Sequence, residues 1–74
     1  MATLQVTAVI EREGDGFVAL CPEFDVASQG DTIEEARANL LEALSLFMET
    51  ASREELSGRM RTEVYVTRLE VAVG

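Results

Sequence analysis

The nine residues from Ser28 to Ala36 constrain the fold most, because they join the end of a strand, a glycine and a complete helix-start signal. Thr32 and Glu35 have the spacing of a capping box, in which each side chain accepts a hydrogen bond from the other residue's backbone amide. Gly30 is expected to supply a turn with positive φ just before the cap. The segment therefore predicts a helix beginning at Thr32, with Gly30, Thr32 and Glu35 in structural roles.

The predicted helix extends from residue 32 to about residue 52, because apolar residues recur there at spacings of three and four. Leu41 and Met48, seven residues apart, form a narrower second strip that either core packing or an intermolecular contact would explain. The main stripe predicts one broad buried face, made of Ile33, Ala36, Leu40, Ala43, Leu44, Phe47 and Ala51.

Three strands are predicted before this helix. Residues 3–12 alternate between apolar and mostly polar side chains, the pattern of a strand with one buried face. The glycines and aspartate of residues 13–16 predict a hairpin turn. Residues 17–21 are apolar on both faces of the second strand, which Pro22 ends, and a short third strand is expected at residues 26–29.

The region after the helix is predicted to form a fourth strand. Residues 53–61 are polar and predict a connection with one helical turn, and residues 62–73 predict a strand with a bulge near residues 67–68. At about 3.3 Å per residue the strand would span about 40 Å and reach beyond its own sheet. The fold class is α+β, in the order β-β-β-α-β, with one helix on one face of a small antiparallel-rich sheet and one domain over residues 1–74.

A single helix leaves the other face of this sheet uncovered. A chain of 74 residues has a small core, and with one cysteine and no histidine it has neither a disulfide nor a zinc site to stabilise it. Oligomerisation is the remaining way to stabilise so small a core, so we expect a homodimer or homotetramer. The expected interface consists of the uncovered face and the last strand, namely Val9, Val18, Leu20, Tyr65, Leu69 and Val71.

The net charge of −8 is concentrated in one part of the chain. Residues 1–52 contain ten acids and two arginines, whereas residues 53–74 contain four of each. Such a charge repels phosphate backbones, which argues against direct nucleic-acid binding and favours a basic partner. Solubility alone would also explain the excess of acids.

The sequence predicts neither catalysis nor membrane insertion. Without a histidine, Ser28 and Cys21 lack that general base, and no cluster of carboxylates suggests a metal site or cofactor. The N-terminal residues alternate instead of forming an apolar leader, and no run approaches the length of a membrane span. A cytoplasmic location is therefore expected.

Two motifs together resemble the HicB-like antitoxin family. The first is a glycine-containing hairpin, an aromatic-led strand and a Pro-acid turn over residues 14–23, and the second is the QGDTIEEARAN helix start over residues 29–39. The resemblance covers about residues 3–50. It implies a partly degenerate RNase H-like fold that binds and blocks a small basic HicA-type RNA-cleaving toxin. The DNA-binding segment of many family members is not seen here, so autoregulation on DNA is not expected.

Three functions remain open at this stage. The first is an antitoxin-like module whose acids Glu13, Asp15, Glu23 and Asp25 face a basic toxin. The second is a stand-alone homo-oligomer that binds a small ligand or another partner between subunits. The third is a residual metal-dependent nuclease, which the scarcity of carboxylates on the first strand makes the weakest.

Overall fold

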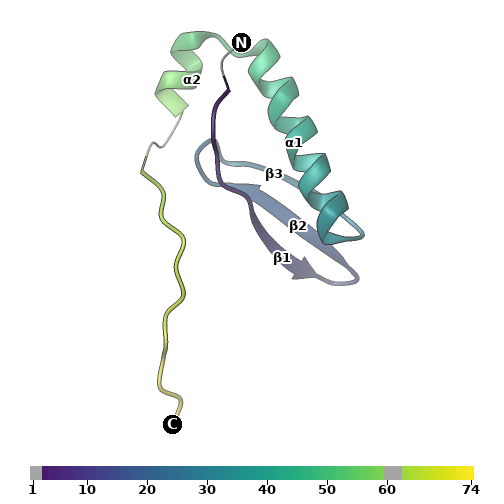
Figure 1. Ribbon diagram of the computed structural model, residues 1–74, viewed down its shortest axis with the longest axis vertical. Helices are drawn as coiled ribbons and strands as arrows, with labels where there is room; N and C mark the ends of the chain where they lie inside the picture. The colour runs from purple at the N-terminus through teal and green to yellow at the C-terminus, as the bar shows by residue number, and fades with distance from the viewer. Residues whose placement is uncertain (1–2, 60–62) are drawn as a thin grey trace.

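The computed structural model describes residues 3–59 and 63–74, and these residues confirm the α+β class (Figure 1). Three antiparallel strands lie in the order β1-β2-β3 and are followed by helix α1, which packs chiefly against β3. A short helix, α2, follows α1. The elements are β1 (Val9–Glu13), β2 (Gly16–Cys21), β3 (Val26–Gly30), α1 (Ile33–Thr50) and α2 (Arg53–Arg59).

The strand register assigns each side chain to one face of the sheet. Ile10 lies opposite Ala19, which lies opposite Ser28, so these three share a face. Helix α1 covers this face, and Ala19 is completely buried there. The buried core consists of Ala19, Cys21, Phe24, Ala36, Leu40 and Leu44.

The turn between β1 and β2 contains two residues, Gly14 and Asp15, as the sequence predicts. Gly14 has a φ of 59°, and Asp15 is not among the residues with positive φ. A positive φ at the first central position alone is the sign pattern of a type II′ turn, whose twist matches that of the flanking strands. The turn therefore holds Glu13 opposite Gly16.

The start of α1 agrees with the sequence at Thr32 but not at Gly30. Thr32 is the N-cap, with φ −126° and ψ 165°, and its hydroxyl accepts a hydrogen bond of 3.0 Å from the Glu35 amide. Gly30 lacks the expected positive φ. Its role is steric, because a Cβ on Gly30 would lie 2.5 Å from the Ala36 nitrogen.

The buried stripe of α1 is narrower than predicted. Ala36, Leu40 and Leu44 are buried, but Ile33 is 49% exposed, so its placement in the core was wrong. The C-terminal end of the stripe has a partner that the sequence did not predict, because the Phe24 ring packs against Phe47 with centroids 5.6 Å apart.

The first strand is shorter than predicted, because residues 3–8 pair with no strand. β2 ends at Cys21, directly before Pro22, so no β2 residue lies opposite residues 3–7. The chain is held there by a side chain instead. The Thr7 amide donates to both carboxylate oxygens of Glu23 at 3.0 Å, and the Thr7 hydroxyl donates to Oε2 at 2.7 Å.

The predicted fourth strand is not formed within the single chain. Residues 63–74, which we call the arm, pair with no strand, and residues 60–62 lie outside the described residues. The expected bulge near residues 67–68 is therefore absent too. Figure 1 shows the arm running away from the sheet, and the chain measures 49 × 28 × 18 Å along its principal axes.

Candidate protein-binding surfaces

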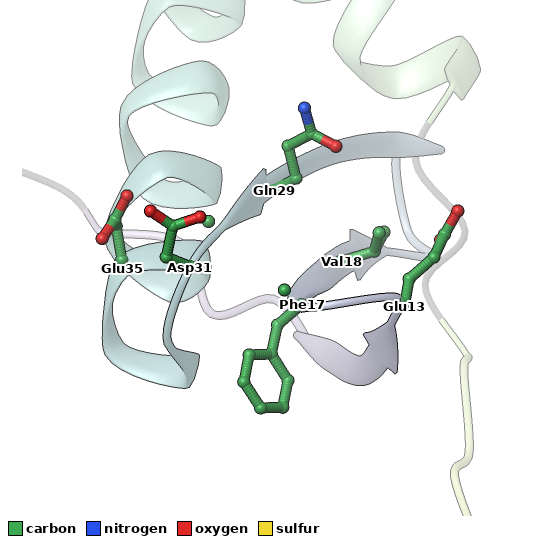
Figure 2. A pocket seen from close by; sticks show the side chains of 8 residues that line it. Glu13, Phe17, Val18, Gln29, Asp31 and Glu35 are labelled. Carbon is green, nitrogen blue, oxygen red and sulfur yellow. The ribbon is translucent and has the colours of Figure 1, made fainter.

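An acidic hollow of about 460 Å³ lies at the hairpin end of the sheet (Figure 2). Its floor includes Val18 and Gln29, which lie opposite each other on the face that α1 leaves uncovered. Gly16 and Gly30 approach each other closely beside this floor. A Cβ on Gly16 would lie 2.8 Å from the Gly30 carbonyl oxygen, so a larger residue at position 16 would not fit. The lining residues are Glu13, Gly16, Phe17, Val18, Gln29, Gly30, Asp31 and Glu35.

Three acids surround this hollow from two sides. Figure 2 shows Asp31 and Glu35 together on one side and Glu13 on the other. All three are exposed. The nearby cation Arg12 is directed to the helix-covered face, where its guanidinium carbon lies 4.6 Å from the centroid of the Phe17 ring. The hollow therefore has three exposed carboxylates and no cation among its lining residues, an arrangement that suits a basic side chain of a partner.

The four acids predicted to contact a partner do not form one surface. Glu13 and Asp15 lie together at the hairpin, and both are exposed. Asp25 is exposed in the turn at the opposite end of β2, with a φ of 56°. Sequence reasoning assigned Asp31 and Glu35 only to the helix start, although their place directly after the β3 glycine brings them beside the hairpin.

Glu23 is not part of an exposed acidic surface, which corrects its predicted role. Only 8% of the residue is exposed, and its carboxylate accepts from the Thr7 amide and hydroxyl. The Cys21 thiol donates to the same carboxylate at 3.5 Å. Glu23 therefore holds residues 3–8 against the end of β2 and cannot meet a partner without breaking these bonds.

The network shifts the titration of both buried groups. Burial raises the pKa of Glu23, but hydrogen bonds from Thr7 and Cys21 to the charged form outweigh it, and the net pKa is lowered from 4.5. Burial is also the main cause that raises the pKa of Cys21 above 9.0, and the Glu23 charge adds to it. At neutral pH the pair is therefore a carboxylate that accepts from a thiol.

The predicted oligomer interface falls into two separate parts. The register places Val9 opposite Leu20 on the face that α1 leaves uncovered, and Val18 lies on the same face, so this apolar cluster exists and is half-buried. Tyr65, Leu69 and Val71 lie instead on the arm and are at least 75% exposed.

A second, less polar groove of about 400 Å³ lies between residues 4–8 and α1. Leu4 is 52% exposed and Leu41 is 60% exposed along it. Val6 packs against the core from the same segment. Leu41, one of the two residues of the predicted second strip, therefore belongs to a surface groove and not to the core.

The described residues show no arrangement for metal binding or membrane insertion. In residues 3–59 and 63–74, no three histidine, cysteine, aspartate or glutamate side chains converge well enough to hold an ion. Over the same ranges, no helix has the length and hydropathy needed to cross a bilayer.

Comparison with known proteins places the chain in a family. It is 31% identical over 68 residues to a UPF0150 protein of Helicobacter pylori, covering 90% of this chain and 94% of that one. It is 49% identical over 47 residues to a UPF0150 protein of Synechocystis, covering 61% and 65%. The chain belongs to the UPF0150 family. No family model matches the chain, and no solved structure matches it either.

Proposed function

We propose that this protein is an antitoxin-like binding module that neutralises a small basic HicA-type toxin by covering its active site. The observation that carries the proposal is the acidic hollow at the hairpin, which has exposed carboxylates on two sides and includes the apolar residues Phe17 and Val18 in its lining. An arginine or lysine of a partner would find charge at the rim and an apolar contact below. The first of the motifs that resemble HicB-like antitoxins begins at this hairpin, and the second begins at Gln29 in the lining of the hollow, which supports the proposal.

Charge distribution supports the same partner class. The whole net charge of −8 belongs to residues 1–52, which include every residue that lines the hollow. Attraction between this part and a basic protein raises the association rate more than the final affinity. We therefore expect toxin binding to slow as the salt concentration rises.

The test is a titration of the purified chain with the HicA-type protein encoded nearest to its gene. Glu13→Lys should slow association at least fivefold, because Glu13 lies at the rim of the hollow. The matched control is Glu49→Lys, which makes the same change of charge on an exposed residue near the other end of α1. Equal effects of the two variants would show that the hollow is not the contact.

Failure to bind any such toxin would contradict the antitoxin proposal. The chain would then be better explained as a homo-oligomer that binds a small ligand or another partner between subunits. An RNA-cleavage assay of the chain alone covers the remaining possibility. We expect no cleavage, and magnesium-dependent cleavage would instead identify a nuclease.

A further inference from the structure

The arm has the composition of a β-strand. Tyr65, Leu69, Val71 and Val73 lie at odd positions, and the even positions hold Arg68, Glu70 and Ala72 but also Val64 and Val66. The alternation is regular over residues 68–73, where it gives an extended chain one apolar face. None of these four apolar side chains is less than 75% exposed. The arm therefore has the sequence pattern of a β-strand but pairs with no strand among the described residues.

The exposed surface of the chain is too large for a compact monomer. A folded protein of 8.1 kDa exposes about 4,500 Å², whereas this chain exposes 6281 Å². The radius of gyration is 14.4 Å, against about 11 Å for a compact domain of 74 residues. The excess of about 1,800 Å² exceeds the roughly 800 Å² that each partner buries in a stable dimer.

Of the two edges of the described sheet, the β1 edge is the more accessible to another strand. β3 lies against α1, and the Asn39 side-chain amide donates to its Gln29 carbonyl at 2.8 Å. β1 pairs with β2 on one side and with nothing on the other. β1 and residues 3–8 together span about 36 Å, which matches the roughly 40 Å of the arm.

We propose that the arm of each copy adds as a strand to the β1 edge of a second copy, in a reciprocal two-fold exchange. The apolar face of the arm then covers the groove between residues 4–8 and α1, where Leu4 and Leu41 are exposed. Backbone pairing supplies hydrogen bonds along the edge, and the groove supplies burial for alternate side chains. The exchange does not rest on the proposed toxin binding.

A second copy fits the arm better than the chain's own sheet or a basic partner. Figure 1 shows the arm leading away from the β1 of its own chain. The arm contains two glutamates and one arginine, a net charge of −1, so it can approach a chain of charge −8 with little repulsion and offers little to attract a basic protein. In the described residues each chain offers one unpaired arm and an accessible β1 edge, which together suffice for a closed two-fold dimer.

The first test compares Val71→Glu with Ala72→Glu in the full chain. The two variants add the same charge to adjacent exposed residues on opposite faces of the arm. Light scattering should give the parent twice the 8.1 kDa chain mass at micromolar concentration. Val71→Glu should weaken dimerisation at least tenfold, and Ala72→Glu less than threefold. A monomeric parent or equal effects of the two variants would overturn the exchange.

The second test asks which chain the arm contacts. Isotope-labelled and unlabelled chains are mixed, and nuclear Overhauser effects are recorded only between the two kinds. The exchange requires such effects between the arm of one chain and β1 or residues 3–8 of the other. Contacts confined within single chains, or a dimer whose arm amides exchange with solvent as fast as in the monomer, would overturn it. No toxin is present in either test.

Discussion

β2 and the arm are built from similar residues but have opposite surroundings. β2 reads Gly-Phe-Val-Ala-Leu-Cys and lies between two strands, with Ala19 and Cys21 completely buried. The arm is also rich in valine, leucine and an aromatic, yet Leu69 and Tyr65 are each 85% exposed. Burial of an apolar strand is thus decided by the neighbours that the topology provides and not by the strand itself.

The largest expected difference between the packed core and the arm is in the free energy of unfolding, when one leucine in each is replaced by alanine. Leu40→Ala should lower the free energy of unfolding by about 3 kcal/mol, because Leu40 is 2% exposed in the core. Leu69→Ala should leave it within about 0.5 kcal/mol in dilute monomer, because the side chain is exposed. Urea denaturation at two protein concentrations measures both.

The concentration dependence sharpens this comparison. If the arm is covered in a dimer, Leu69→Ala should destabilise the protein only at the higher concentration, whereas Leu40→Ala should act equally at both. A loss of several kcal/mol from Leu69→Ala at the lowest concentration would mean that the arm packs within its own chain.

The next effect concerns the close approach of β3 to α1. Gly30→Ala should destabilise the packed region by about 2 to 3 kcal/mol, because its Cβ would meet backbone atoms of Glu35 and Ala36 at 2.8 and 2.5 Å. Gly58→Ala is the matched control, since a Cβ there meets nothing within 4 Å. Thermal unfolding should show a lower midpoint for the first variant and an equal or higher one for the second. Equal midpoints would mean that the helix start yields easily.

Glu23→Gln should lower stability at neutral pH by about 2 kcal/mol, because it weakens hydrogen bonds to a buried charged acceptor. The lowered pKa of Glu23 means that its charged form stabilises the folded state. That contribution is complete above pH 4.5 and is lost as the pH falls through the lower folded-state value. Parent and variant should therefore converge in strong acid.

The control for this pH dependence is Glu42→Gln, which changes an exposed carboxylate on α1. It should change the free energy of unfolding by no more than about 0.5 kcal/mol, both at neutral pH and in acid. If the difference between parent and Glu23→Gln stayed constant from pH 7 to pH 3, the carboxylate would not be responsible for the attachment of residues 3–8.

The smallest expected effect is at the helix cap. Thr32→Ala removes the hydroxyl that accepts from the Glu35 amide and should destabilise the protein by about 1 kcal/mol. Binding of a partner should fall only as far as folded protein is lost. Unchanged stability with a large loss of affinity, both measured by calorimetry, would make Thr32 a contact residue instead.

The sequence predicted correctly those turns, strand ends and caps that depend only on residues adjacent in the chain. The hairpin at Gly14, the end of β2 at Pro22 and the cap at Thr32 each follow from the chemistry of a few adjacent residues. The pairing of strand ends could not be predicted in this way. The Thr7–Glu23 contact joins residues 16 positions apart, and no periodicity marks a carboxylate that replaces a strand partner.

The same limit explains what was missed at the candidate sites. Glu23 looked like any exposed acid in a Pro-acid turn, whereas its burial depends on where residues 3–8 cross that turn. Asp31 and Glu35 reach the hollow only because β3 brings the helix start beside the hairpin. Their charge was visible in the sequence, but their proximity to Glu13 was not.

The hydrogen bond from Asn39 to the Gln29 carbonyl opposes the addition of a strand at the β3 edge of the sheet. A sheet with two receptive edges can grow without end, as in a fibril. Here the β3 edge lies against a helix and has one of its carbonyl groups occupied, which makes it a poorer acceptor of a strand than the β1 edge. In the proposed exchange each β1 edge accepts one arm, so growth would end at the dimer. An Asn39→Ala variant would retain the first pairing but lose part of the barrier against polymerisation.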